Sequence, residues 1–173
     1  FGIAAEPQQL QHYILLDELG RGGMGVVYAA YDRKSDRKVA IKLLRLRDGR
    51  EQQLRLVREA KAMAKIAHPN VVQIHEIGET EEMTYIVMEY IEGVTLRQWL
   101  SNAPRSIPEI LATFVAAGRG LAAAHAKGLV HRDFKPDNVM IRRDNRVVMD
   151  FGFARALADE DEPAPSPVPL ALC

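Results

Sequence analysis

The sequence contains almost no cysteine: the single Cys173 is the last of 173 residues. One thiol cannot form a disulfide within the chain, which excludes a disulfide-held scaffold and favours a reducing compartment, so we expect a cytoplasmic protein. No uninterrupted apolar run approaches the roughly 20 residues that a membrane helix needs. The residues after Phe1 also lack the basic flank and apolar stretch of a signal peptide. We therefore expect no membrane segment in this chain.

The sequence also lacks an excess of charge of either sign. Its 23 basic residues balance 23 acidic ones, which gives no reason to expect nucleic acid or anionic membrane surfaces as partners. Apolar residues make up 47% and charged residues 27% of the chain, as is usual for globular proteins. A chain of this length can bury the core of one domain or of two small ones.

The most informative stretch that is present covers residues 131–138. There His131, Arg132, Asp133, Lys135 and Asn138 place an acid, bases and an amide within one short segment. Residues 150–152, Asp-Phe-Gly, follow with a second acid and a glycine that can bend sharply. Each side chain also has a structural interpretation, since an acid and a lysine two positions apart are usually surface charge and an asparagine can cap a turn. We expect His131 to pack in the core.

A glycine-rich segment near the N-terminus predicts a phosphate-binding turn. Gly20, Gly22 and Gly25 fit the pattern G-x-G-x-x-G between expected strands at 13–19 and 26–31. Glycines let backbone N–H groups close over a phosphate without Cβ clashes. The same spacing marks dinucleotide-binding folds, but there the glycines open a helix. Residues 26–28, Val-Val-Tyr, continue as a strand, so the β-hairpin interpretation is favoured.

The following residues predict the rest of a small sheet with one helix. A strand at 38–44 carries Lys42, which in an isolated apolar strand would usually point to solvent. Residues 51–67 form a helix with Glu59 beside its apolar stripe. The stripe consists of Leu54, Val57, Ala60, Met63 and Ala64. Strands at 71–78 and 83–89 complete a five-stranded sheet, so residues 13–90 form one unit after a flexible lead-in at 1–12.

The second half predicts helices and a short hairpin. A short helix covers 95–102, and Ser106 with Glu109 forms a capping box at the start of a longer helix that runs to about Lys127 and ends at Gly128. Its expected core face is Ile110, Leu111, Phe114, Val115 and Leu121. Residues 139–141 and 147–149 form a hairpin that leads to Asp150. We assign 91–157 to this second unit and 158–173, acidic and then proline-rich, to a disordered tail.

Five ordered motifs resemble those of eukaryotic-like protein kinases, from Tyr13 to about Arg155. They are the glycine-rich hairpin, Val-Ala-Ile-Lys at 39–42, the helix glutamate, His-Arg-Asp with its asparagine at 131–138, and Asp-Phe-Gly at 150–152. Lys135-Pro136 resembles the serine/threonine branch, and residues 22–28 resemble its bacterial members. Phe134 and Phe153 are departures that remove no polar role. The resemblance implies an α+β, protein-kinase-like fold: a complete N-lobe and the first part of a helical C-lobe.

The resemblance implies a role for each motif residue. Asp133, Lys135 and Asn138 would be catalytic, and Asn138 with Asp150 would hold Mg²⁺. Residues 88–93 look like the hinge between lobes, with backbone groups near Glu89 and Tyr90 for the adenine. The implied ATP contacts are Leu19, Gly20, Arg21, Gly22, Gly23, Met24, Gly25, Val27, Ala40, Lys42, Glu59, Met88, Glu89, Tyr90 and Met140. The implied protein substrate carries a serine or threonine acceptor.

Kinase domains usually continue well beyond the residue that corresponds to Arg155. We therefore expect a catalytic domain truncated after Asp-Phe-Gly, either as a fragment or as a truncated gene product, and weak or inactive alone. One alternative is a non-catalytic ATP-binding or interaction module. Another is a small-molecule phosphotransferase on the same scaffold, which is less favoured because such enzymes usually lack His-Arg-Asp and Lys135-Pro136.

Overall fold

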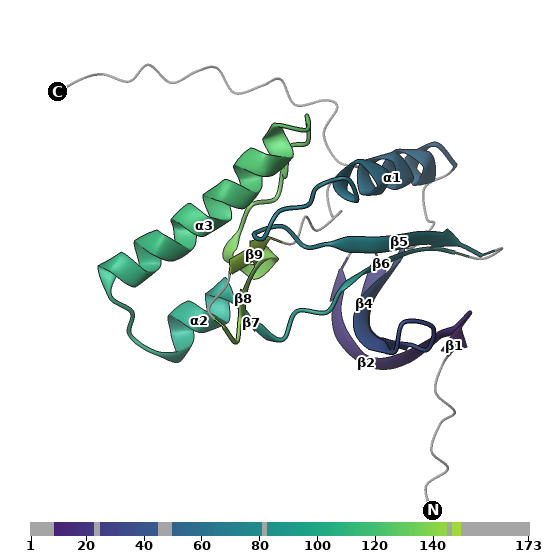
Figure 1. The fold of residues 1–173 in the computed structure, drawn as a ribbon, viewed down its shortest axis with the longest axis horizontal. Coiled ribbons are helices and arrows are strands. Elements are labelled where there is room, and N and C mark those ends of the chain that lie inside the picture. Colours follow the sequence, from purple (N-terminus) through teal and green to yellow (C-terminus); the bar gives the residue numbers. More distant parts are fainter. Residues whose placement is uncertain (1–8, 23–24, 45–49, 81–82, 145–146, 150–173) are drawn as a thin grey trace, which may run out of the picture.

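The computed structural model describes residues 9–22, 25–44, 50–80, 83–144 and 147–149 (Figure 1). The first part is a curled antiparallel sheet with one helix. Its strands are β1 (Gln9–Leu10), β2 (Tyr13–Gly22), β3 (Gly25–Asp32), β4 (Arg37–Leu44), β5 (Ile74–Glu79) and β6 (Thr84–Glu89), and its helix is α1 (Arg50–Met63). The second part contains β7 (Gly93–Thr95), α2 (Leu96–Asn102), α3 (Ile107–His125), the 3-10 turn η1 (Pro136–Asn138), β8 (Val139–Arg142) and β9 (Val147–Met149).

The sheet has six strands in the order β1-β2-β3-β4-β6-β5 and not the five predicted. The additional strand, β1, lies in the segment expected to be a flexible lead-in, where Leu10 pairs with Tyr13. The predicted glycine-rich hairpin is present. Gly22 pairs with Gly25 across residues 23–24, so the glycines belong to the ends of β2 and β3 themselves.

Both faces of this sheet bury apolar side chains. Because side chains alternate along a strand, Ala40 and Ile41 lie on opposite faces of β4, and both are less than 10% exposed. Ala40 joins a cluster that includes residues of α1 and of the second part of the fold. Ile41 joins a cluster on the other face, with Tyr13, Val39, Tyr85 and Val87. Burial on both faces explains why residues 39–41 form a continuous apolar run.

Helix α1 is shorter than the helix predicted over 51–67. It ends at Met63, after which Ile66 N donates to Met63 O at 2.9 Å in a tightened final turn. Only part of the predicted stripe is buried: Val57, Ala60 and Met63 pack inward, whereas Leu54 is 49% exposed. Among the side chains of α1 that the structure describes, the buried ones begin at Val57.

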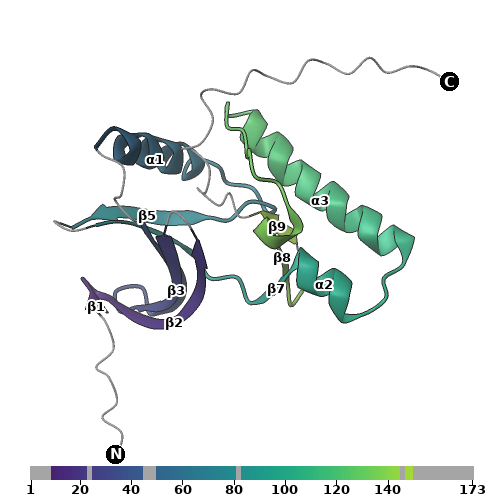
Figure 2. The same cartoon turned by 180° about the vertical axis from the view of Figure 1, so that it is seen from behind.

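The second part is more extensively paired than predicted. The expected hairpin of β8 and β9 gains β7 as a third strand, with Val94 opposite Ile141 (Figure 2). Thr95, expected as the first residue of the short helix, is instead the N-cap of α2, in a capping box with Gln98. The predicted capping box of Ser106 and Glu109 at the start of α3 is present. In Figures 1 and 2, β7–β9 lie between α3 and the six-stranded sheet.

The predicted core face of α3 is wrong for Leu111, Phe114 and Val115, which are exposed, whereas Ile110 is half-buried and Leu121 packs against the core. Its buried positions are Thr113, Ala117, Gly120 and Ala124, and these small residues allow close approach to β9, against which the helix packs. The outer side carries Ile107, Leu111, Phe114 and Val115, which are between 39% and 74% exposed. By length and composition alone α3 could cross a membrane, but core helices of soluble proteins share these properties, so this is weak evidence.

Candidate active site

The segment between α3 and β8 folds around the buried His131. Its side chain is in the core, at 7% exposure, and its ring packs edge-on against Phe134 with centroids 6.2 Å apart. The backbone N–H of Asp133 donates to His131 O at 2.7 Å and lies 3.3 Å from His131 Nδ1. Arg132, between them, has a φ of 59°, an uncommon conformation for a residue other than glycine. His131 therefore has the structural role expected of it: it fixes the turn that presents Asp133.

Asp133 is the centre of a polar network made by the predicted catalytic residues. Lys135 Nζ lies 2.8 Å from Asp133 Oδ2. Asn138 Nδ2 donates to the backbone oxygen of Asp133 at 2.8 Å and to Oδ2 at 3.1 Å. The Asp133 side chain is 16% exposed. The fold thus brings three predicted residues together around one partly buried carboxylate.

The orientation of the Asn138 amide follows from its partners. Both contacts of Nδ2 are oxygens, so the nitrogen must face Asp133, and the amide oxygen Oδ1 points elsewhere. An amide oxygen is the kind of ligand that Mg²⁺ prefers. Asp150, the other predicted metal ligand, lies outside the described residues.

The end of this loop is held by an ion pair that the sequence did not predict. Arg97 on α2 binds Asp137 in η1 through two contacts of 2.7 Å, Nε to Oδ1 and Nη2 to Oδ2. The guanidinium holds the pKa of Asp137 below its usual value. Forty positions separate the two residues, so no local pattern links them. The bidentate geometry orients η1, and Asn138 with it.

Four predicted nucleotide contacts lie on one face of the sheet. Val27 is opposite Lys42 in the β3–β4 register, and Ala40 is opposite Met88 in the β4–β6 register. Directly opposed residues share a face, as do residues two apart on a strand. Val27, Ala40 and Met88 also belong to or pack against one apolar cluster. The half-buried Lys42 therefore lies on the same face as the apolar surface formed by these three residues.

The structure describes most, but not all, of the other residues predicted to contact ATP. Leu19, Gly20 and Arg21 lie exposed on β2, and Met140 is half-buried on β8. Glu59 is half-buried on α1, and its predicted ion pair with Lys42 stays a prediction. Gly22 and Gly25 close the described ends of the hairpin, while Gly23 and Met24 lie outside the described residues.

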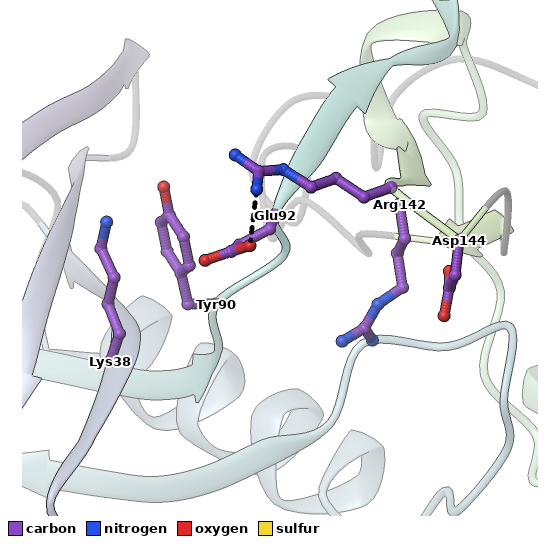
Figure 3. Close-up of a pocket in the computed structure, with 6 residues that line it drawn as sticks. Lys38, Tyr90, Glu92, Arg142 and Asp144 are labelled. Carbon is purple, nitrogen blue, oxygen red and sulfur yellow. Dashed lines mark ion pairs between the residues drawn. The ribbon is translucent and has the colours of Figure 1, made fainter.

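The hinge segment after β6 lines a pocket of about 370 Å³ (Figure 3). The ammonium of Lys38 lies 4.1 Å from the centre of the Tyr90 ring. The pocket is lined by Lys38, Tyr90, Glu92, Arg142, Arg143 and Asp144. Five charged side chains do not suit the apolar faces of an adenine, so this pocket is distinct from the surface around Ala40.

Comparison with known proteins agrees with this architecture. The chain matches the protein kinase domain family over residues 13–168. It is 45% identical over 165 residues to the serine/threonine-protein kinase PknB of Mycolicibacterium smegmatis, covering 88% of this chain and 26% of that protein. It is 41% identical over 150 residues to the serine/threonine-protein kinase PrkC of Bacillus subtilis, covering 84% of this chain and 23% of that protein. The chain thus spans about a quarter of the length of these curated relatives.

Solved structures show the same fold. The Mycobacterium tuberculosis PknI kinase domain superposes with a TM-score of 0.74 at 31% identity, covering 88% of this chain and 64% of that one. The apo form of PpkA-294 superposes with a TM-score of 0.75 at 25% identity, covering 88% and 63%. With its sheet, hinge and Asp133 network, the chain belongs to the protein kinase family, among relatives that are bacterial serine/threonine-protein kinases.

Proposed function

We propose that the protein to which this chain belongs transfers the terminal phosphoryl group of ATP to serine or threonine hydroxyls of proteins. The observation that carries the proposal is the carboxylate of Asp133, held by Lys135 and Asn138. Phosphoryl transfer needs positioning and charge stabilisation from the protein more than covalent chemistry. A fixed carboxylate with an adjacent ammonium supplies both.

In the proposed reaction Asp133 orients the attacking hydroxyl and accepts its proton. Lys135, whose ammonium lies 2.8 Å from the carboxylate, would offset negative charge on the transferred phosphoryl group. Two fixed contacts limit the rotation of the Asp133 side chain, so little reorganisation is needed when the hydroxyl arrives. The bond from the terminal phosphorus to the bridging oxygen breaks as the bond to the hydroxyl oxygen forms.

The nucleotide would lie against the sheet face that carries Val27, Ala40 and Met88. These side chains offer apolar contact to the adenine, and Lys42 on the same face would bind phosphate oxygens. Mg²⁺, when bound, would neutralise phosphate charge, and the outward-turned amide oxygen of Asn138 fits it as a ligand. We assign the second ligand to Asp150 on the sequence motif alone.

The proposal is tested by pairing a binding titration on this chain with a transfer assay on the whole protein to which the chain belongs. Asp133→Ala should lower transfer of labelled phosphate to a serine/threonine protein substrate by roughly a hundredfold or more. It should change the Kd for Mg·ATP by less than about threefold, because Asp133 contacts the hydroxyl and not the nucleotide. Glu79→Ala, which removes an exposed carboxylate at the far end of β5, is the matched control.

The outcomes separate the candidate functions. Nucleotide binding with no transfer, unaffected by Asp133→Ala, would favour the non-catalytic ATP-binding module. Transfer that persists in Asp133→Ala would refute the role of the carboxylate. No binding of Mg·ATP by the wild-type chain would refute the nucleotide site itself.

A further inference from the structure

Glu89, the last residue of β6 and part of the hinge segment at 88–93, contacts both parts of the fold through its side chain. Its Oε2 accepts from Arg142 Nη1 at 3.1 Å, at the end of β8. Its Oε1 accepts from the backbone N–H of Gln73 at 3.4 Å, just before β5. The backbone N–H of Glu89 in turn donates to Gln73 O at 2.9 Å. We call Gln73, Glu89 and Arg142 the hinge bridge.

The neighbouring residues provide a natural comparison for this bridge. Arg143, directly after β8, also contacts the hinge, with its Nη1 3.6 Å from Oε2 of Glu92; the dashed line in Figure 3 ends on Glu92. Their side chains are 84% and 61% exposed, whereas those of Arg142 and Glu89 are 27% and 24% exposed. Water screens an exposed pair joined by a single contact, which then restrains geometry little. A half-buried, hydrogen-bonded pair holds its geometry better.

The two oxygens of Glu89 serve different parts of the molecule. One carboxylate holds the segment before β5 on one side and the second part of the fold on the other. Loss of Arg142 would leave a half-buried carboxylate without its cation, and loss of the Glu89 charge would leave the half-buried guanidinium of Arg142 without its anion. The bridge is therefore expected to behave as a unit in which either single change has most of the effect of both.

We propose that the side chain of Glu89 is a positioning residue of the nucleotide site. By fixing the hinge against Gln73 and Arg142, it holds in place the backbone that would meet the adenine. A pre-ordered hinge loses less conformational entropy when a ligand binds, which strengthens binding without any new contact. This inference rests on the proposed nucleotide-binding function and gives a role to a side chain where only the backbone was assigned one.

Binding measurements on the full chain test this role. Glu89→Gln and Arg142→Met should each raise the Kd for adenosine and for Mg·ADP by the same factor, roughly three- to tenfold. The factor is the same for both ligands because the bridge acts at the adenine end. The Kd of the double variant should be no more than about twofold above the larger of the two single-variant Kd values. Glu92→Gln and Arg143→Met, the exposed pair, should leave both Kd values within about twofold.

A second measurement needs no ligand. Hydrogen exchange at the backbone amide of Glu89, followed by NMR, should become roughly tenfold faster in Arg142→Met and stay unchanged in Arg143→Met. An unchanged exchange rate in Arg142→Met would overturn the inference, whether or not nucleotide binds. If the wild-type chain bound no adenosine or Mg·ADP, the proposed function would fail separately.

Arg142→Lys distinguishes positioning from general stability. It keeps the positive charge near Glu89, so the Kd for Mg·ADP should return to within about threefold of the wild-type value. Equal loss of binding in Arg142→Lys and Arg142→Met, together with equally lowered unfolding midpoints, would assign Arg142 a merely structural role. Unchanged Kd values in both bridge variants would also overturn the inference.

Discussion

Gly25 and Gly20 belong to the same glycine pattern, yet alanine at the two positions should have opposite effects on stability. Gly25 has a φ of 152°, which side-chain-bearing residues rarely adopt. A Cβ there would lie 1.9 Å from the backbone oxygen of Leu43, where ordinary contact begins at 3.4 Å. At Gly20 a Cβ would meet nothing within 4 Å. The sequence pattern gives both positions the same importance, and the structure does not.

The magnitudes follow from these geometries. Gly25→Ala combines an unfavourable backbone conformation, about 1–3 kcal/mol, with a clash that strand β4 can relieve only by moving its backbone, about 1–3 kcal/mol. We expect it to lower the free energy of unfolding by roughly 2–5 kcal/mol. Gly20→Ala should raise it by about 0.5 kcal/mol, because alanine loses less backbone entropy in a strand.

Urea unfolding followed by circular dichroism measures both effects, and a titration with Mg·ATP separates them from function. If Gly20→Ala weakens nucleotide binding while stability rises, the glycine is needed for the approach of phosphate and not for the fold. A Gly25→Ala chain as stable as the wild type, to within about 0.5 kcal/mol, would refute the reasoning.

Three further predictions concern the rest of the fold. Burial raises the pKa of Tyr85 to about 12, with Glu76 adding to the effect. The stability that the neutral hydroxyl contributes should therefore be intact below pH 10 and be lost as pH rises towards 12. In Tyr85→Phe, the urea midpoint should change less with pH over this range. Gly93→Ala would place a Cβ 2.0 Å from a β8 carbonyl oxygen and should cost about 1–3 kcal/mol in thermal or urea unfolding, whereas Gly118→Ala, with open space around it, should stabilise α3 by about 0.5–1 kcal/mol. Leu111→Gln, at a position 59% exposed, should reduce light scattering at high protein concentration and change the unfolding free energy by less than about 0.5 kcal/mol.

The parts of the fold that could be predicted are those whose signal is local. The glycine hairpin, the apolar run at 39–41 and the Ser106–Glu109 capping box each lie within a few consecutive residues. Strand β1 has two residues and exists only through its pairing with β2. Strand β7 likewise depends on β8, far along the sequence, where Ile141 pairs with Val94. Neither short segment carries a periodic pattern of its own, so neither was predicted.

The prediction of the buried face of α3 was wrong in part, and for a different reason. Large apolar residues were expected to be buried, but close approach to β9 favours small ones, so Ala117 and Ala124 are inside while Leu111 and Val115 are outside. In the candidate site, Asp133 and Asn138 are five positions apart and follow from the motif. The pair of Arg97 and Asp137 does not, because a surface arginine has many possible partners and only the fold selects one.

The carboxylate of Glu76 shows what kind of motion the first part of the fold permits. It accepts from the hydroxyl of Tyr13 on β2 at 2.8 Å and from that of Tyr85 on β6 at 3.2 Å, although β2 and β5 are separated by three strands in the sheet order. The hydrogen bond from Tyr13 thus spans the curl visible in Figure 1, while that from Tyr85 comes from the neighbouring strand. A curl held across three strands in this way resists flattening, so the described strands of this sheet are expected to move as one rigid body.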